Sequence, residues 1–366
     1  MKKAAIATLA LFILHTVFAA PLSSADDFQI ARPGYEFAFP RDHGNHPEYR
    51  TEWWYYTGHL RTASGQRYGF EVTFFRVGID RAPKATEWDL RHVMPAHVAI
   101  TDPANKAFRY YEKLNRASPY TAGAAVGKLD VFNEAWRVTT NPDGSWRLVA
   151  SEGKDSIDLT MRSRKAPAVH GENGVSVKAQ GVGFASHYYS MTRLEVSGTI
   201  AAGGARERAT GQAWMDHEFG SSRLRENQRG WDWFSIQLDN DSEIMLYVIR
   251  RADGSADVTS SGSLIGSNGD VIPIRREQMR ITPLERWKSK KSGATYPVAW
   301  RVELPSFRVA LTVRPLLREQ ELVTAGSTQV TYWEGAVDVS GSFDGVAVRG
   351  QGYVEMTGYD KAFRAP

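Results

Sequence analysis

Cysteine is absent from this chain of 366 residues, and neither sign of charge dominates. Without cysteine the chain forms no disulfide and offers no thiol nucleophile, so large hydrophobic cores must hold it together. The formal net charge of +4 includes Lys2 and Lys3, and without these two residues it is +2. This balance argues against nucleic acid as a partner.

Long apolar runs are also missing, except at the N-terminus. There a short basic start precedes the apolar residues 4–18, and small residues follow. This pattern is typical of a secretory signal peptide, which we place at residues 1–25 with cleavage after Ala19 or Ala25. We therefore expect an exported protein, periplasmic or secreted, with no transmembrane segment after signal cleavage.

Several motifs that carry chemistry are absent as well. No Gly-x-Ser-x-Gly sequence marks a serine nucleophile, and no glycine-rich phosphate loop precedes a helix. The histidines show no closed metal-binding spacing, and the weak ligand candidates are residues 216–218 and the pair His43 and His46. We expect no metal and no organic cofactor.

Aromatic residues, in contrast, are abundant: 11 Trp, 15 Tyr and 16 Phe. Such a load suits β-strands and cavities for apolar ligands. Apolar and polar residues alternate in segments such as 193–200 and 308–313, and turn signals such as 141–144 separate these segments. The chain is therefore predicted to be all-β and antiparallel. Only residues 279–291 suggest a helix, and Pro283 would keep it short.

The chain repeats itself. Residues 53–60 resemble residues 231–238, and residues 211–216 have a counterpart at 350–355 in the same order. Without the signal peptide, about 340 residues also exceed the ~250–300 that a single core usually serves. We infer two homologous antiparallel β-barrels in tandem.

The boundary between the two units is expected in the charged segment 221–229. The N-terminal barrel would then comprise residues 26–225 and the C-terminal barrel residues 226–366. In this alignment Asp216 of the first unit corresponds to Glu355 of the second.

The segment 211–220 is the richest in candidate chemistry. Trp214, Asp216 and Glu218 alternate on a predicted strand and would share one face. An acid beside an aromatic wall suits proton chemistry on an apolar ligand, but a well-packed barrel end can look the same. Nearby, Glu52 could bridge to Arg76 across a hairpin.

Five segments resemble the AttH/CrtC family, whose members include carotenoid 1,2-hydratases and AttH components encoded with ABC transporters. These segments are residues 51–60, 72–76, 96–102, 214–220 and 230–238. The resemblance covers nearly the whole chain after the signal peptide. It implies two lipocalin-like barrels of the calycin type, although the Gly-x-Trp mark of true lipocalins is missing.

The hydratase activity of some members implies addition of water across a terminal isoprenoid double bond. By match to the family's motif, Asp216 would protonate the alkene and Trp214 would stabilise the resulting cation, with Glu218 on the same face. A carboxyl group acts as an acid near neutral pH only when burial raises its pKa. The alternative is a purely structural role, in which Asp216 accepts hydrogen bonds from backbone amides at a barrel rim.

The aromatic strands are expected to form core and cavity wall. The predicted ligand-binding residues are Trp53, Trp54, Tyr56, His97, Trp231, Trp233 and Glu355. For His97, a structural histidine held by hydrogen bonds is the more ordinary interpretation.

Our leading hypothesis is a periplasmic lipocalin-like protein that binds a lipid or isoprenoid, as a carrier or as an accessory to an ABC-type export system. The alternative is a cofactor-independent hydratase or lyase of the carotenoid 1,2-hydratase type. Two further interpretations are a secreted hydrolase, as many family members are named, and a structural protein whose barrels are filled by their own side chains.

Overall fold

The computed structural model describes residues 28–81, 86, 89–172, 174–221 and 224–363. The predicted signal peptide and its cleavage sites lie outside these residues. The helical turns within them are the short 3₁₀ turns η1 (Arg41–His43), η2 (Arg276–Gln278) and η3 (Pro305–Phe307). In this part of the chain, no helix is long and apolar enough to cross a membrane.

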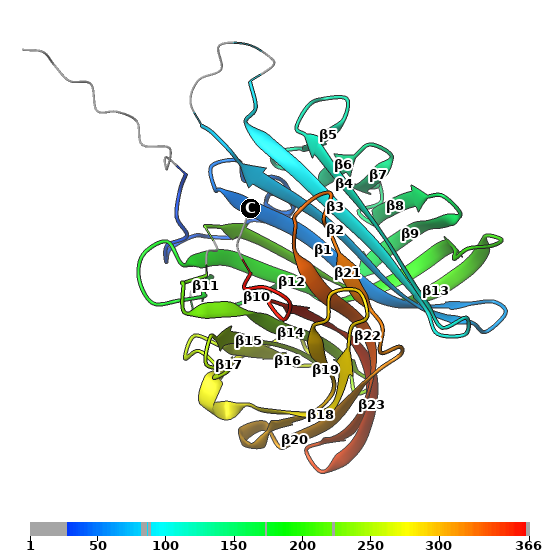
Figure 1. The fold of residues 1–366 in the computed structure, drawn as a ribbon, viewed down its shortest axis with the longest axis vertical. Coiled ribbons are helices and arrows are strands. Elements are labelled where there is room, and N and C mark those ends of the chain that lie inside the picture. The colour runs from blue at the N-terminus through cyan, green and yellow to red at the C-terminus, as the bar shows by residue number, and fades with distance from the viewer. Residues whose placement is uncertain (1–27, 82–85, 87–88, 173, 222–223, 364–366) are drawn as a thin grey trace, which may run out of the picture.

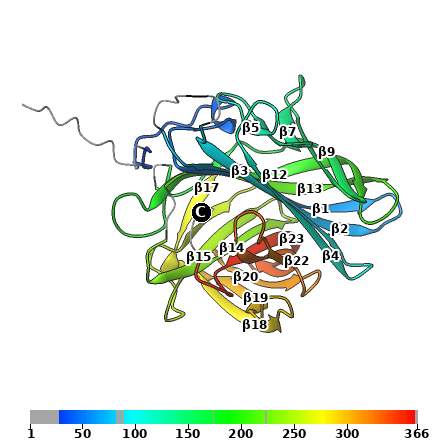
Figure 2. The ribbon, with the colours of Figure 1, turned by 45° about the horizontal axis from the view of Figure 1, so that its top comes forward.

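The described chain forms two antiparallel sheets that pack against each other (Figures 1 and 2). The first sheet contains β1 (Thr51–Thr62), β2 (Arg67–Gly78), β3 (His92–Asp102), β4 (Ala107–Arg116), β5 (Ala122–Ala124), β6 (Asp130–Asn133), β7 (Trp136–Thr140), β8 (Trp146–Glu152), β9 (Asp155–Ser163), β10 (Ala168–Val169), β11 (Val175–Val177), β12 (Ala185–Ala201) and β13 (Glu207–Gly220). The second contains β14 (Gln228–Leu238), β15 (Glu243–Arg251), β16 (Ser261–Ile265), β17 (Val271–Arg275), β18 (Arg280–Lys288), β19 (Thr295–Leu304), β20 (Val309–Pro315), β21 (Glu321–Val323), β22 (Thr331–Phe343) and β23 (Val346–Thr357).

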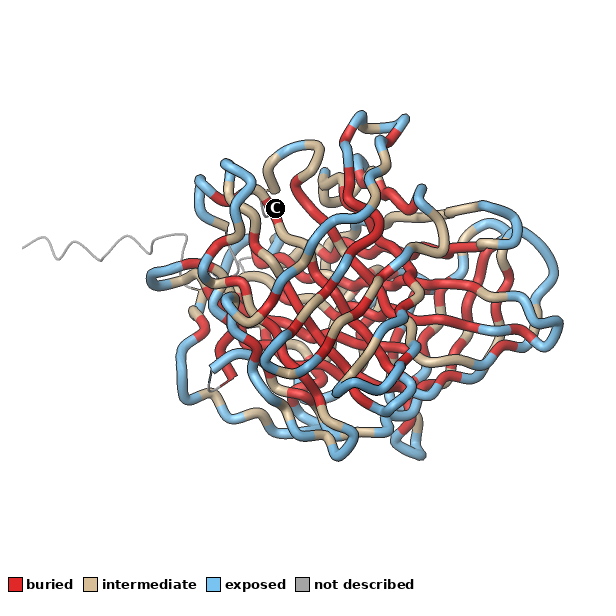
Figure 3. Tube along the Cα trace, turned by 90° about the horizontal axis from the view of Figure 1, so that it is seen from below, coloured by how far each residue is buried: buried red, intermediate tan, exposed pale blue. Residues whose placement is uncertain are grey.

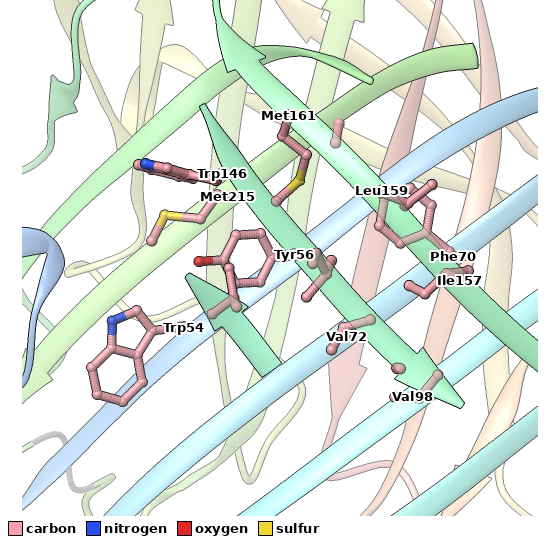
Figure 4. Close-up of a cluster of buried hydrophobic side chains, with 14 of the residues drawn as sticks. Trp54, Tyr56, Phe70, Val72, Val98, Trp146, Ile157, Leu159, Met161 and Met215 are labelled. Atoms are coloured by element: carbon pink, nitrogen blue, oxygen red, sulfur yellow. The ribbon is translucent and has the colours of Figure 1, made fainter. Parts of the chain in front are cut away.

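The first sheet is a nearly closed barrel with the strand order β4-β3-β2-β1-β13-β12-β9-β8-β7-β6-β5. Its two ends come together where the Asn133 side chain of β6 donates to the Met94 carbonyl of β3 over 2.6 Å. Trp54, Tyr56 and Trp146 are among the buried side chains that fill its interior (Figure 4). This interior is therefore a packed core.

The second sheet is a half-barrel with the order β17-β16-β15-β14-β23-β22-β20-β19-β18. Its own core gathers around Phe234, Trp300 and Trp333. The all-β prediction with two barrel-like units is confirmed. The short helix suggested for residues 279–291 is wrong, because β18 occupies most of this segment and pairs with β19.

The strands at the middle of each sheet are buried on both faces, as Figure 3 shows by its red centre. In β12, residues 194–197 alternate between buried and exposed, but residues 185–194 are buried without a break. One face of such a strand covers its own core and the other meets the opposite sheet. This two-sided burial explains why the aromatic strands lack a simple alternation of apolar and polar residues.

Equivalent strands of the two sheets make equivalent contacts across the interface. His59 of β1 donates from Nε2 to the carbonyl of Gly352 on β23 over 2.8 Å. Gln237 of β14 donates from Nε2 to the carbonyl of Ala213 on β13 over 2.9 Å. His59 and Gln237 occupy matching positions in the inferred repeat, as do Ala213 and Gly352, so the two units face each other with matching surfaces.

Candidate functional site

A cavity of about 150 Å³ lies between the two sheets, outside both barrel cores. It is large enough for more than one water molecule. Its aromatic wall is made by Trp53, Tyr55, Phe75, Tyr188, Trp231, Trp233, Tyr247, Tyr332 and Phe363. The wall comes from both sheets, so the site exists only when the two units are packed together.

Asp216 on β13 faces this cavity and is held by three side-chain donors. Trp214 Nε1 donates to Oδ1 over 2.6 Å, and the Ser190 hydroxyl donates to the same oxygen. The Tyr188 hydroxyl donates to Oδ2 over 2.6 Å and itself accepts a hydrogen bond from Trp233 Nε1 over 3.0 Å. The carboxyl group is thus fixed by side chains, contrary to the expectation that backbone amides might hold it.

Burial raises the pKa of Asp216 to about 7, although the hydrogen bonds from Ser190, Tyr188 and Trp214 act in the opposite direction. The nearby carboxylate of Glu218 adds to the rise. An acid with a pKa near neutral pH can both donate and accept a proton under physiological conditions. The arrangement therefore suits general acid–base chemistry.

Glu218 lies on the same face of β13 and is paired with a lysine. Its Oε1 is 2.9 Å from Lys178 Nζ and also accepts a hydrogen bond from the Ser186 hydroxyl. The Lys178 ammonium lies 4.4 Å from the centre of the Tyr247 ring and 5.1 Å from that of Tyr188. Glu218 therefore forms an ion pair with Lys178.

The second sheet supplies two more carboxyl groups to the same cavity. Glu355 on β23 accepts a hydrogen bond from Trp231 Nε1 over 3.0 Å, and Glu334 on β22 accepts one from the Tyr55 hydroxyl over 2.7 Å. The two glutamates are direct neighbours in the strand register. Burial raises the pKa of Glu355 to about 7, and burial together with Glu355 raises the pKa of Glu334 well above its usual range.

His97 on β3 also lines the cavity. Its Nδ1 is hydrogen-bonded to the Tyr332 hydroxyl, and its Nε2 lies 2.9 Å from the Ser327 hydroxyl. Burial lowers the pKa of His97 to about 3, so the ring is neutral. Both nitrogens are occupied by structural partners, which fits the ordinary interpretation of this residue.

A second polar cluster lies next to the cavity around Glu52. Its carboxylate receives Arg76 Nε over 3.0 Å, His217 Nε2 over 2.9 Å and His46 Nδ1 over 2.8 Å. The expected bridge from Glu52 to Arg76 is therefore present. Potential ligand atoms of His46, Glu52 and His217 lie within 4.8 Å of one another. The two histidines and Arg76 all hydrogen-bond to Glu52, so these residues form one buried polar network.

A sequence model of the AttH-like family matches residues 30–359. The chain belongs to the AttH-like family. Its fold is shared by a Nitrosomonas europaea protein provisionally named AttH, which is 34% identical over 91% of this chain and 100% of that one, with a TM-score of 0.81. The resemblance read from the sequence is confirmed.

Two further relatives carry the names of lyases. The dehydratase AsqC of Emericella nidulans is 22% identical over 70% of this chain and 75% of its own length. The structure of kievitone hydratase from Nectria haematococca has a TM-score of 0.69 at 15% identity, covering 92% of this chain and 97% of that one, which shows a common fold. Among our hypotheses, the names of these similar proteins favour the hydratase alternative over simple ligand binding.

The structure gathers most of the predicted site residues of this AttH-like chain around one cavity. Trp53, His97, Trp231, Trp233, Asp216, Glu218 and Glu355 line it. Trp214 stands behind Asp216 as a hydrogen-bond donor and is not part of the lining. Trp54 and Tyr56 point the other way, into the core of the first barrel, because neighbouring residues of a strand face opposite sides.

Sequence reasoning missed Tyr188, Ser190, Lys178 and Glu334. Ser186, Tyr188 and Ser190 alternate on one strand, and this pattern beside the aspartate strand could have pointed to them. The strand pairing that brings Ser190 opposite Asp216 is visible only in the fold. Lys178 lies in a loop and carries no sequence signal.

We predict that Glu52→Gln strongly destabilises the protein. The substitution leaves the fully buried guanidinium of Arg76 without its counter-charge, a loss that costs about 3–5 kcal/mol in buried pairs. The free energy of unfolding in urea measures the effect. Glu303→Gln, which removes an exposed pair with Arg301, is the control and should cost less than about 1 kcal/mol. Equal losses in both variants would contradict the prediction.

We also predict that stability falls as pH rises from 6.5 to 8. Burial raises the pKa of Asp216 and Glu355 to about 7 and that of Glu71 to about 8. The folded state therefore holds protons that the unfolded state has already released, so the free energy of unfolding decreases with pH, by about 3 kcal/mol. Burial alone would lower the pKa of His46, but hydrogen bonds to Asp42 and Glu52 raise it to about 9. The contribution of His46 to the free energy of unfolding therefore also decreases as pH rises.

Thermal unfolding followed by circular dichroism at pH 6.5 and 8 measures this slope. Glu71→Gln mimics the protonated side chain and should flatten the slope. The exposed Glu195 provides the matched control, because Glu195→Gln should leave the slope unchanged. A Tm that rises over this pH range would refute the argument.

Proposed function

We propose that this protein is a cofactor-independent hydro-lyase, a hydratase or dehydratase, that acts on an apolar small molecule bound between its two sheets. The observation that carries the proposal is the buried carboxyl group of Asp216, with a pKa of about 7, in an aromatic cavity. The hydratase and dehydratase among the relatives support the same class of reaction. A terminal isoprenoid alkene, or the corresponding tertiary alcohol, has the required chemistry.

In the hydration direction, protonated Asp216 gives its proton to one alkene carbon. The π electrons form the new C–H bond and leave a cation on the neighbouring carbon. The faces of aromatic rings such as those of Trp231 and Trp233, and the carboxylate that Asp216 becomes, stabilise this cation. Trp214 serves this step by holding Asp216 in place.

Water then attacks the cation and forms the C–O bond. Glu355 faces the cavity from the opposite sheet and is placed to accept the proton that the water releases. Return of that proton to Asp216 through water restores both groups, so the net reaction is the addition of one water molecule. Dehydration runs through the same steps in reverse.

Replacing the acid should abolish turnover. The protein is incubated with a panel of terminal isoprenoid alkenes in water labelled with oxygen-18, and the extracts are analysed by mass spectrometry. We expect label in a tertiary alcohol with the unaltered protein and a loss of roughly 10²–10⁴-fold in Asp216→Asn. Asp158→Asn, which removes a partly exposed pair with Arg147 on β8, is the control and should keep full activity.

The same experiment separates the proposal from our earlier leading hypothesis. An unmodified apolar compound that co-purifies with the protein, with no label in any product, would indicate a carrier. Turnover that is unchanged in Asp216→Asn would remove this residue from the mechanism.

The rate of hydration should show a bell-shaped dependence on pH with its maximum near 7. The productive form needs Asp216 protonated and Glu355 ionised, and burial raises the pKa of both to about 7. Activity is therefore lost on the alkaline side as Asp216 ionises and on the acidic side as Glu355 is protonated. In Glu355→Gln the overall rate should fall and the acidic limb should disappear. An acidic limb that persists in this variant would exclude Glu355 as the base.

Export to the periplasm and an ABC-type export partner are separate proposals that rest on the sequence alone. The N-terminal pattern at residues 1–25 motivates the first, and the resemblance to AttH components encoded with ABC transporters motivates the second. N-terminal sequencing of the protein isolated from its cells would test the expected cleavage after Ala19 or Ala25.

A further inference from the structure

The cavity has an inner end between the sheets and an outer end at one edge of them. Asp216 and Tyr55 lie at the inner end, where they are neighbours in the strand register and both are buried. Further along these strands the two sheets meet directly, through the contact of His59 with Gly352. The cavity therefore ends there.

The outer end lies where β1 begins and β23 ends. Thr51, Trp53 and Trp231 line this end and are partly exposed, whereas Tyr55 and Asp216 are buried. The strand from Tyr55 to Thr51 is about 13 Å long, because each residue of an extended strand adds about 3.3 Å. We infer that a ligand enters from this edge and reaches Asp216 with its leading end.

A short segment after β23 returns to the outer end. Gly358 turns the chain at a φ of +74°, and a Cβ at this position would lie 2.1 Å from the Arg229 carbonyl oxygen. The backbone N–H of Phe363 donates to the same carbonyl over 2.6 Å. The Phe363 ring meets the Trp231 ring edge-on, with 4.5 Å between their centres, and it lines the cavity.

The residues between these two points are anchored to the second sheet. The Tyr359 hydroxyl donates to the Asp232 carboxylate over 3.1 Å, and the Arg250 guanidinium lies 3.8 Å from the centre of the Tyr359 ring. The Thr331 hydroxyl donates to the Asp360 carboxylate over 3.3 Å. These contacts fix the segment, and with it the phenyl ring at the outer end of the cavity.

The volume of the cavity limits how much of a ligand it can hold. A cavity of about 150 Å³ has the size of an engineered cavity that binds benzene. One isoprenyl unit of five carbons is of similar size, so the rest of a longer ligand must lie at the outer end. This unit has to enter first, because its double bond must reach Asp216. The body of the ligand then passes the ring of Phe363.

We propose that Phe363 is a specificity-determining residue that limits the width of the ligand next to its buried isoprenyl end. The cavity-lining residues outside the strands are Lys178, Leu224, Thr328, Val330 and Phe363. Among them Phe363 has the bulkiest side chain and a rigid one. A linear chain passes beside its ring, whereas a six-membered ring at the same place collides with it. The choice of an isoprenyl end rests on the proposed function.

Two saturated alcohols test the width limit without any turnover, because neither contains a double bond. Tetrahydrogeraniol continues its branched end as a linear chain, and 4-isopentylcyclohexanol carries the same kind of end on a six-membered ring. Equilibrium dialysis, with the free alcohol measured by gas chromatography, gives the Kd of each. The ratio of the two Kd values cancels changes that affect both ligands equally, such as a lost contact between Phe363 and Trp231.

We expect the unaltered protein to bind the linear alcohol more tightly. In Phe363→Ala the ring compound should gain roughly tenfold relative to the linear one, as for a difference of about one methylene group in an apolar pocket. Phe363→Trp narrows the outer end and should shift the ratio the other way. This variant keeps an aromatic ring against Trp231, so the test does not depend on the folding of Phe363→Ala.

Phe307 provides the matched control, because it is a partly buried phenylalanine that packs against the core of the second sheet and does not line the cavity. Phe307→Ala should leave the ratio unchanged. The proposal would be overturned by a ratio that is the same in Phe363→Ala and the unaltered protein, by an unaltered protein that prefers the ring compound, or by binding of neither alcohol.

The width limit and the proposed reaction can fail separately. A ratio that shifts as expected, with no label in the oxygen-18 experiment, would leave Phe363 as the width limit and remove the hydratase activity. Label in a tertiary alcohol, with an unchanged ratio, would do the reverse.

Discussion

The structure depends on the packing of one sheet against the other. The middle strands β1, β12, β13, β14 and β23 are buried on both faces, so any polar side chain on the facing surfaces is removed from water. Where a donor and an acceptor meet, as between His59 and Gly352, the contact fixes how the sheets align. Where carboxyl groups meet around a space, the same burial raises their pKa. Fold and candidate chemistry thus have one physical cause.

The two halves of the site use burial differently, although their strands are equivalent. In the strand register, Asp216 lies opposite Ser190, whereas its counterpart Glu355 lies opposite Glu334. The serine is a neutral hydrogen-bond donor and adds no charge beside the aspartate. The glutamate is a second acid, and two neighbouring carboxylates resist joint ionisation. The repeat therefore places an aspartate with a neutral neighbour in one sheet and a pair of neighbouring glutamates in the other.

The sequence contained enough to predict the all-β fold, the two units and part of the cavity wall. Strand period and internal repeat are local signals, and together with the family resemblance they indicated Asp216, Trp231 and Glu355 as site residues, all three of which line the cavity. Trp54 and Tyr56 were predicted to bind ligand but lie in the core of the first barrel. A strand that is buried on both sides is aromatic on both sides, so alternation does not distinguish core from cavity. The position of Lys178 at the site depends on the path of a loop, and that of Ser190 depends on strand register. Only tertiary packing determines these two features.

A cavity rich in carboxyl groups would be a poor site for an anion. Burial disfavours the ionised forms of Glu334 and Glu355, and the charge of Glu355 adds to this effect at Glu334. A carbocation formed beside them would reverse this bias, because a nearby positive charge favours ionised carboxyl groups. The negative potential of the ionised carboxyl groups is unfavourable in the empty cavity. It becomes favourable only as positive charge develops on the substrate. Such an environment stabilises a cationic transition state more than it stabilises a neutral alkene or alcohol, which is the condition for catalysis.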